Sequence, residues 1–235
     1  MQIPFFYLRH YDPVQTEIVL DEDTSRHVIT VLRMKKGEQI NLTDGNGNLL
    51  TAEIINDHKK KSEVRINASR FIPHASRQIT IAISLIKNSS RFEWFLEKAT
   101  EIGVSTIQPV ICERTEKQKF RFDRMQDILV SAMLQSQQAW LPELMPPVPF
   151  RQVAEQSNHD QKFIAHCLAQ EKRKLADLVN ENLSSQLILI GPEGDFTIEE
   201  VQLAMKNHFT GISLGDSRLR SETAGVVAAT ILKLL

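Results

Sequence analysis

A six-residue segment near the end of the chain, Arg218–Thr223, holds two arginines, a glutamate and two hydroxyl groups. It follows the short apolar run Ile212–Leu214 and precedes a long apolar stretch, a pattern that predicts a buried strand, a loop and a helix. The dipole at the start of a helix favours Glu222, so helix capping explains that residue taken alone. The same dipole opposes Arg218 and Arg220. An anionic partner explains the two arginines better, because the planar guanidinium fork suits phosphates and polar rings.

A second loop of this kind follows the apolar run Leu187–Ile190 and consists of Gly191-Pro192-Glu193-Gly194. Glycines at the end of a strand allow a ligand to approach the backbone closely. A tight turn between strand and helix explains the tetrapeptide equally well when it is taken alone. Ligands of open parallel α/β sheets bind at the carboxyl ends of the strands. We therefore predict that this loop and Leu214-Gly215 follow adjacent strands and form the walls of a pocket.

Two further motifs lie upstream of these loops. One is the segment Phe92–Val104, and the other combines His27-Val28 and Val31–Met34 with Gly37 and Asp44-Gly45. Together with the two loops they cover nearly the whole chain. The four motifs, in the order in which they occur along the chain, resemble the RsmE family of SPOUT-class RNA methyltransferases. Gly45 and Gly47 do not belong to the glycine-rich fingerprint of dinucleotide-binding proteins, because the third glycine is missing and a predicted strand comes next.

The resemblance implies an α/β fold of two domains. Residues 1–72 would form a small PUA-like β-barrel that binds RNA, and residues 73–235 a SPOUT domain whose C-terminal strands and helix make a deep trefoil knot. Because true knots are nearly absent from protein folds, the knot is expected from the resemblance alone.

The resemblance also implies S-adenosylmethionine as the cofactor, held in these loops mainly by backbone groups and apolar side chains. His166 is added because it ends the predicted strand Phe163–His166. No metal ion is expected, since the histidines lack the spacing of metal ligands. The cofactor residues that we expect are Leu189, Ile190, Gly191, Pro192, Glu193, Gly194, Leu214, Gly215, Ser217, Leu219 and His166.

The reaction implied by the family is methylation of N3 of a uridine in 16S ribosomal RNA of the small ribosomal subunit. The N3 proton must leave, because the neutral imide is a poor nucleophile. Arg220 is the first catalytic candidate, as a group that stabilises the uracil anion, and Glu222 is the second, as the proton acceptor. The sequence leaves this choice open. The expected RNA contacts are Arg9, Arg26, His27, Arg33, Arg114 and Arg218.

Two alternative functions stay open at this stage. The first is a SPOUT enzyme with another RNA target, such as a ribose 2′-hydroxyl. The second is an RNA-binding assembly factor that kept the fold without catalysis.

The chain departs from the family pattern at several positions. Asp195 stands where the last glycine of the family's Gly-Pro-Glu-Gly-Gly is usual, and Asn88 stands where glycine is usual. The family's Glu-Gln-x-x-Arg before a proline has Leu134 and Gln138 in place of its two charged residues.

The composition is that of a globular protein, with 42% hydrophobic and 24% charged residues and a net charge of −1 over 235 residues. Near-neutral charge disfavours a protein that coats nucleic acid non-specifically.

No apolar stretch is long enough to span a bilayer, and we expect neither a secretory signal nor a disulfide. Cys112 and Cys167 are predicted to be buried, reduced thiols in a cytoplasmic protein.

The hydrophobic pattern predicts a β-rich start and alternating strands and helices from Gln78 onward, which is typical of a mostly parallel sheet covered on both faces. The final helix, Glu222–Leu235, is more apolar than a one-sided surface helix, so we expect a two-fold homodimer.

Capping boxes are predicted at Ser90 and Thr197. The expected N-terminal elements are strands over Glu17–Leu20, Gln39–Thr43, Leu49–Ile55 and Ser62–Ile66 and a helix over Thr24–Arg33. The expected later elements are strands over Ile79–Ile86, Thr106–Cys112, Phe163–His166, Leu187–Ile190 and Ile212–Leu214, and helices from Ser90 to Gly103 and over Asp123–Gln138, Lys172–Asn180, Thr197–Asn207 and Glu222–Leu235.

Overall fold

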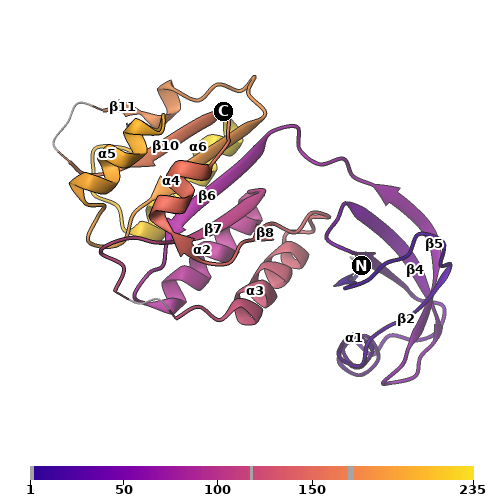
Figure 1. The fold of residues 1–235 in the computed structure, drawn as a ribbon. Helices are drawn as coiled ribbons and strands as arrows, with labels where there is room; N and C mark the ends of the chain where they lie inside the picture. The colour runs from indigo at the N-terminus through magenta and orange to yellow at the C-terminus, as the bar shows by residue number, and fades with distance from the viewer. Residues whose placement is uncertain (1–2, 117–118, 169–171) are drawn as a thin grey trace. The chain divides into compact units, whose positions relative to one another are not determined.

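The computed structural model describes residues 3–116, 119–168 and 172–235. These residues form two compact units (Figure 1). The first contains the chain up to His74 together with Met133–Leu141, and the second contains Ala75–Ala132 and Pro142–Leu235. The segment Met133–Leu141, which carries the family departures Leu134 and Gln138, therefore packs with the N-terminal unit although it lies far along the chain.

The first unit is a five-stranded sheet in the order β1-β3-β4-β5-β2, with β1 and β3 parallel and the other neighbours antiparallel. Its apolar residues alternate along the strands, so one face builds the core. Leu50, Ala52 and Ile54 are fully buried on that face, as their spacing predicts. The strands are β1 (Phe5–Tyr7), β2 (Glu17–Val19), β3 (Gln39–Thr43), β4 (Asn48–Asn56) and β5 (Glu63–Phe71).

The predicted hairpin between β3 and β4 is confirmed. Gly45 and Gly47 have φ angles of 72° and 91°, which L side chains rarely adopt. The segment Ala139–Leu141 is joined to this turn by backbone hydrogen bonds, from Leu141 to Gly45 and from Gly47 to Ala139, each 2.9 Å long. A Cβ atom on Gly47 would lie 2.7 Å from the Trp140 ring, so glycine is required there for packing as well as for its φ angle.

The helix predicted over Thr24–Arg33 is wrong in extent and kind. A short helix α1 (Glu22–Arg26) begins at the N-cap Asp21 and continues into one turn of π-helix over His27–Val31. The wider turn changes the angular spacing of the side chains. Val28 is buried as expected, whereas Val31 and Leu32 are 64% and 42% exposed.

The second unit contains an eight-stranded sheet whose strand pairs are all parallel. The main path runs β11-β13-β10-β12-β6-β7-β8, and β9 pairs with β7. Its strands are β6 (Gln78–Ser84), β7 (Thr106–Ile111), β8 (Glu143–Leu144), β9 (Val148–Pro149), β10 (Gln161–Ala165), β11 (Arg173–Lys174), β12 (Ser185–Ile190) and β13 (Thr210–Ser213).

Helices cover both faces of this sheet (Figure 1). Helix α6 packs against α2, β6 and β12, and α4 packs against α5. The helices are α2 (Ser89–Ile102), α3 (Phe122–Gln135), α4 (Phe150–Gln156), α5 (Ile198–Lys206) and α6 (Ser221–Leu234).

The alternation along β12 decides which of its side chains faces which layer. Leu187 and Leu189 belong to a buried cluster with Phe150, Phe196 and Val201, on the α4 and α5 face. Ile190 pairs with Ile83 of β6, whose side chain lies at the α6 helix beside Gly225. Neighbouring residues of β12 thus serve opposite faces of the sheet.

The helix ends include one correction and two confirmations. Helix α2 begins at Asn88, whose side chain accepts a 2.9 Å hydrogen bond from the Ser90 amide, so the capping box predicted at Ser90 is wrong. Asn88, a departure from the family's glycine, is the N-cap. Gly103 ends the helix in a left-handed conformation as expected, and the capping box of Thr197 and Glu200 is present.

The helix predicted over Lys172–Asn180 is wrong. The described part of this segment forms strand β11 and a 3-10 turn over Leu175–Asp177. Leu175 is the side chain that the segment buries, so it lacks the repeated apolar positions that hold a helix against a core. Helix α4 was not predicted. Its N-cap is Pro149, which makes no side-chain capping hydrogen bond, so the usual sequence signal of a helix start is missing.

Candidate active site

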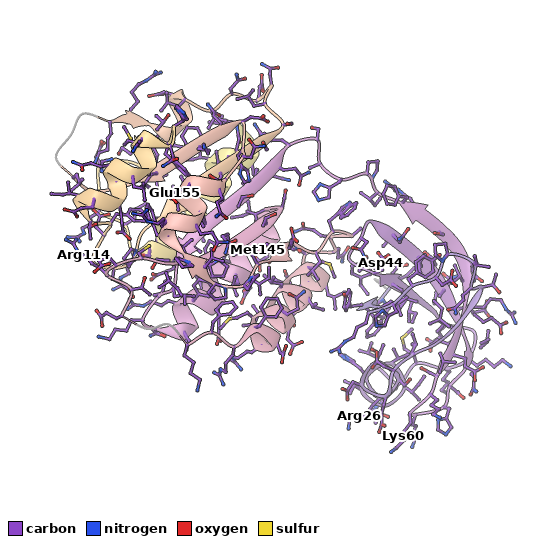
Figure 2. All side chains as sticks on the ribbon, in the orientation of Figure 1. Arg26, Asp44, Lys60, Arg114, Met145 and Glu155 are labelled. Carbon is purple, nitrogen blue, oxygen red and sulfur yellow. The ribbon has the colours of Figure 1, made fainter. Side chains whose placement is uncertain are left out.

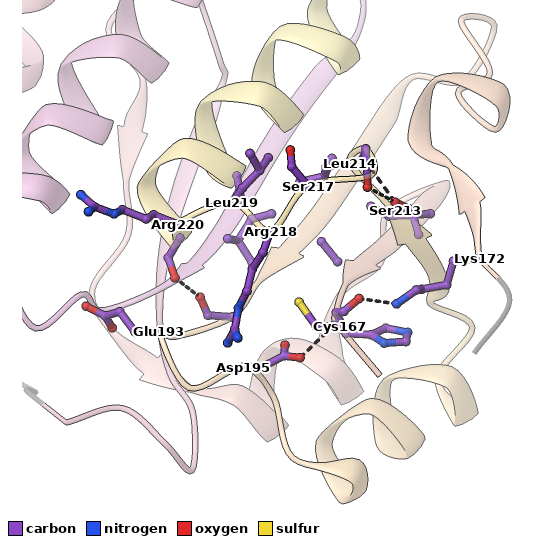
Figure 3. A pocket seen from close by; sticks show the side chains of 18 of the residues that line it. Cys167, Lys172, Glu193, Asp195, Ser213, Leu214, Ser217, Arg218, Leu219 and Arg220 are labelled. Atoms are coloured by element: carbon purple, nitrogen blue, oxygen red, sulfur yellow. Dashed lines mark hydrogen bonds between the residues drawn. The ribbon is translucent and has the colours of Figure 1, made fainter. Parts of the chain in front are cut away.

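A cavity of about 550 Å³ lies where three parallel strands of the second unit end (Figure 3). The strands are β10, β12 and β13, with β10 in the middle. The expectation that the two glycine-bearing loops follow adjacent strands is therefore wrong, although both loops line the same cavity. The lining consists of Ala165–Cys167, Lys172, Ile190–Glu193, Asp195, Ile212–Ser221 and Ala224.

The loop after β12 is held by contacts to several elements of this unit. The Ser221 hydroxyl donates a 2.7 Å hydrogen bond to the Gly191 carbonyl. The Glu193 carboxylate accepts from the Lys87 amide at 3.1 Å. A Cβ atom on Gly191 would lie 3.1 Å from the Phe196 ring. Packing against Phe196 therefore accounts for the glycine at this position, independently of any ligand.

The loop after β13 forms the opposite wall of the cavity. Ser213 folds it back on itself, since its hydroxyl donates to the Gly215 carbonyl at 2.8 Å and accepts from the Gly215 amide at 3.2 Å. Gly215 has a φ of 140° and open space where a Cβ would stand. Leu214 and Leu219 are half-buried and give the wall its apolar surface.

The loop after β10 contributes His166 and Cys167. His166 is 7% exposed, and its Nδ1 is buried with no hydrogen-bond partner among the residues that the structure describes. Burial, and then the nearby Lys172, lower the pKa of His166, so its ring is neutral at neutral pH. Cys167 is exposed, which corrects the prediction that both thiols are buried, because its residue lies beyond the strand end.

Cys112 agrees with its prediction. It is buried beside β7, and burial raises the pKa of its thiol to about 12. Neither cysteine forms a disulfide in the described part of the chain.

Arg218 and Arg220 both line the cavity and are exposed. Arg220 is the residue immediately before α6, and Figure 3 shows the two side chains extending in different directions. The segment thus offers two exposed cations at the cavity, as the sequence suggested.

Glu222 lies elsewhere. It is 6% exposed and does not line the cavity. Its Oε1 is 3.7 Å from Nε of Arg91, and its Oε2 is buried with no hydrogen-bond partner among residues 3–116, 119–168 and 172–235. The carboxylate is therefore placed beneath the start of α6 rather than facing the cavity.

Two members of the predicted cofactor set, Leu189 and Gly194, also lie outside the lining. Leu189 is fully buried on the α4 and α5 face. The Gly194 carbonyl points to Arg114, whose Nη1 donates to it at 2.7 Å. The members that do line the cavity are Ile190, Gly191, Pro192, Glu193, Leu214, Gly215, Ser217, Leu219 and His166.

Several lining residues were not predicted. Asp195 was noted only as a departure from the family pattern, and Cys167 only as a thiol. Lys172 carried no sequence signal. Its place in the lining depends on backbone carbonyls, since its Nζ donates to those of His166 and Leu168 at 2.6 Å and 2.9 Å. Ser221 and Ala224 lie in the motif before the last helix, where the arginines drew attention instead.

The residues predicted to contact RNA in the first unit have different surroundings. Arg9 lines a shallow hollow of about 350 Å³ with Tyr11, Asp44 and Asn46. Arg26 is exposed and forms an ion pair with Asp23, and Figure 2 shows it at the surface of this unit.

His27 and Arg33 follow helix α1. The His27 ring packs edge-on to Phe6 with a centroid distance of 5.6 Å. Arg33 is exposed and has a left-handed backbone with a φ of 58°. His27 belongs to the π-helical turn, and Arg33 follows it.

Arg114 of the second unit is exposed (Figure 2) but has one guanidinium nitrogen committed to the Gly194 carbonyl. Arg114 opens the densest basic segment of the sequence, Arg114–Arg124, which also contains Lys117, Lys119, Arg121 and Arg124. Arg124 is paired with Glu93 at 2.7 Å, and Lys117 lies outside the described residues.

No group of three or more His, Cys, Asp or Glu side chains that could hold a metal ion occurs in the described ranges. None of the helices in those ranges is long and apolar enough to cross a membrane.

Comparisons with known proteins agree with this geometry. Residues 73–233 match the family model of an RNA methyltransferase domain, and residues 20–67 match that of an RNA methyltransferase PUA domain. A probable rRNA methyltransferase from Porphyromonas gingivalis is 33% identical, covers 97% of this chain and 95% of its own, and superimposes with a TM-score of 0.89. A ribosomal RNA small subunit methyltransferase E from Neisseria gonorrhoeae, solved bound to S-adenosyl methionine, is 30% identical, with 99% and 97% coverage and a TM-score of 0.88.

The chain belongs to the ribosomal RNA small subunit methyltransferase E family. A curated member from Synechocystis is 29% identical over 92% of this chain and 72% of its own length. The resemblance drawn from the four sequence motifs is thereby confirmed. As a member of this methyltransferase E family, the protein is an S-adenosylmethionine-dependent RNA methyltransferase with a mixed α/β fold and a PUA domain.

Proposed function

We propose that this protein transfers a methyl group from S-adenosylmethionine to N3 of a uridine in 16S rRNA of the small ribosomal subunit. The observation that carries the proposal is the cavity at the ends of β10, β12 and β13, with Arg218 and Arg220 at its rim, in a chain of this family. Its position follows the rule that parallel α/β sheets bind ligands at the carboxyl ends of their strands.

The cavity residues fit the cofactor by size and chemistry. A volume of about 550 Å³ lies within the range of small-molecule sites. Ile190, Leu214 and Leu219 offer an apolar surface for an aromatic ring, and the loop backbones offer polar groups. The carboxylates of Glu193 and Asp195 can compensate the positive charge of the cofactor's sulfonium group. When bound, S-adenosylmethionine supplies an electrophilic methyl group.

Arg220 is the residue that we assign to the target base. Its exposed guanidinium at the rim of the cavity can stabilise the negative charge that uracil acquires when N3 loses its proton. Glu222 was the alternative, as proton acceptor. Because Glu222 is buried beside Arg91 and lies outside the lining, its geometry favours a role in holding the start of α6.

The finer features of the fold belong to the proposal as well. We infer a trefoil knot at the C-terminal strands and helix, and a closed PUA-like barrel over residues 1–72, with the SPOUT domain over residues 73–235. The barrel would bind the structured RNA through Arg9, Arg26, His27 and Arg33, with Arg114 and Arg218 as contacts nearer the cavity. The reaction would take place in the cytoplasm, where ribosomal subunits assemble.

A two-fold homodimer is proposed from helix α6. Its Gly225, Ala228 and Leu232 are buried, whereas Val226 and Ile231 remain half-exposed. A second copy of the chain would remove this apolar surface from water. Light scattering at micromolar concentration should give the mass of a dimer, and a monomer would reject this part of the proposal.

Nucleoside analysis of ribosomal RNA tests the activity. Small subunits from cells lacking the protein should gain one methyl group per 16S rRNA when incubated with the enzyme and S-adenosylmethionine, and digestion should yield 3-methyluridine. A 2′-O-methyl nucleoside would identify a SPOUT enzyme with another target. Absence of any methylation, with binding to the subunit intact, would identify an assembly factor.

A further inference from the structure

The loop after β12 contains a non-glycine residue in a left-handed conformation. Asp195 has a φ of 63°, at the position where the family pattern usually has glycine. Glycine adopts this conformation without steric cost, whereas an L side chain does so with strain. The aspartate therefore has to be explained by what its side chain contacts.

The Asp195 carboxylate joins two loops of the cavity. Its Oδ1 accepts a 2.8 Å hydrogen bond from the Phe196 amide, within its own loop. Its Oδ2 accepts a 2.8 Å hydrogen bond from the amide of Cys167, in the loop after β10 (Figure 3). Hydrogen bonds to a charged acceptor are stronger than those between neutral groups. The carboxylate thus fixes the distance between the loops after β12 and β10.

The loop after β10 is held from its other side by a cation. Lys172 donates from Nζ to the carbonyls of His166 and Leu168, at 2.6 Å and 2.9 Å. Residues 166–168 of this loop are thus held by an anion on the amide of Cys167 and by an ammonium on the carbonyls that flank it. Asp195, Lys172, His166 and Cys167 all line the cavity.

We propose that Asp195 is a positioning residue for the cofactor. It holds the loop after β10 where His166 and Cys167 form one wall of the cavity before S-adenosylmethionine enters, so that binding does not have to order this loop. Fixing a binding loop in advance raises affinity because less conformational freedom is lost on association. The proposal rests on the proposed function, since it assigns the cavity to this cofactor.

The test compares two substitutions to glycine. Asp195→Gly removes the bridge and relieves the left-handed strain. His208→Gly relieves the same kind of strain, since His208 has a φ of 66°, is exposed and lies outside the cavity lining. His208→Gly should unfold at or above the wild-type temperature without ligand. Asp195→Gly should unfold at a lower temperature than His208→Gly, because the loss of two hydrogen bonds opposes the relief of strain. In calorimetry with S-adenosylhomocysteine, Asp195→Gly should raise the Kd about tenfold, because binding would then have to order the residues that the bridge holds in advance.

His208→Gly should leave the Kd within twofold of wild type. Asp195→Asn keeps one oxygen acceptor and should give an intermediate Kd. Amide exchange at Cys167 should accelerate in Asp195→Gly. In methylation assays with small subunits, Asp195→Gly should raise the KM for S-adenosylmethionine and leave kcat nearly unchanged.

Two results would overturn the proposal. One is an Asp195→Gly variant that binds S-adenosylhomocysteine as tightly as wild type. The other is a variant that loses thermal stability with unchanged affinity, which would identify a purely structural bridge. If Asp195→Gly fails to fold, the Kd of Asp195→Asn decides in the same way. Failure of the wild-type protein to bind S-adenosylhomocysteine would instead reject the proposed function, and this inference with it.

Discussion

The Ser221 hydroxyl donates a 2.7 Å hydrogen bond to the Gly191 carbonyl, and this bond ties the start of α6 to the loop after β12. Ser221 is 7% exposed, so water does not replace the bond easily. The two residues are far apart in sequence, and both line the cavity. Through this contact, the element that carries Arg220 is held in register with the loop that carries Glu193.

Substitution Ser221→Ala should lower the free energy of unfolding by about 1 to 2 kcal/mol, because the Gly191 carbonyl is left buried without its donor. Affinity for S-adenosylhomocysteine should fall as well, since the loop after β12 loses an anchor. Urea denaturation and calorimetry measure the two effects. Ser131→Ala is the control, because the Ser131 hydroxyl makes an exposed bond to Asp127 within its own helix. Equal behaviour of the two variants would show that the Ser221 bond is dispensable.

Five strands of the second unit (β6, β7, β10, β12 and β13) could be predicted because each is an apolar run bounded by polar or glycine-rich segments. The two-residue strands β8, β9 and β11 lack such a run and were not predicted. The loops that carry function were found for the same reason, since they follow such runs directly. The order of the strands could not be predicted. Nothing in Phe163–Ala165 indicates that β10 separates β12 from β13, because strand order is decided by long-range pairing.

Individual side chains of the site were predicted less well than the loops. Leu189 and Ile190 are chemically alike, and only the register of β12 decides that Ile190 lines the cavity and Leu189 enters the core. Glu222 was a catalytic candidate because its carboxylate could accept the N3 proton, whereas its burial beside Arg91 depends on how α6 packs against α2. The departure at Asp195 could be seen in the sequence, but its partner Cys167 follows a different strand.

Substitution Arg220→Ala should reduce methyl transfer to small subunits by about 10² to 10³-fold, because the developing charge on uracil loses its stabilising cation. Affinity for S-adenosylhomocysteine should change little. Single-turnover methylation and calorimetry measure the two quantities. Arg151→Ala, which removes an exposed arginine paired with Glu155, is the matched control. An equal loss of cofactor affinity would move Arg220 into the cofactor pocket, and wild-type turnover would remove it from the site.

The pH dependence of stability should report His166. Its pKa in the folded protein is lowered from 6.5, by burial first and then by Lys172. The folded state therefore favours the neutral ring. This contribution to stability is fully present above pH 6.5, the ordinary value, and is lost as the pH falls below it toward the folded pKa.

The unfolding temperature should therefore decline from pH 7 to pH 5, and His166→Gln should make this decline shallower. The pKa of His159 is also lowered by burial, so His159→Gln provides a comparison within the same protein. Only His166→Gln should in addition change the pH dependence of S-adenosylhomocysteine binding, because His159 is not in the cavity lining. A decline that is identical in wild type and His166→Gln would contradict this assignment.

Charge reversal in the first unit tests whether that unit recognises the substrate. Removal of residues 1–71 is a poor test, because Trp140 and Leu141 pack against the turn at Gly45 and Gly47 and would lose their partners. Arg9→Glu and Arg33→Glu alter exposed side chains and leave that packing intact.

If these arginines contact phosphates, each substitution should weaken binding of the small subunit and reduce the salt dependence of binding, because fewer counterions are released. Affinity for S-adenosylhomocysteine should stay at the wild-type value. Lys61→Glu changes an exposed charge in the turn between β4 and β5 and serves as the control for net charge. Filter binding across a range of salt concentrations measures the slopes. If both arginine variants bind and methylate the subunit like Lys61→Glu, these two residues only solubilise the unit, and the RNA contacts lie elsewhere.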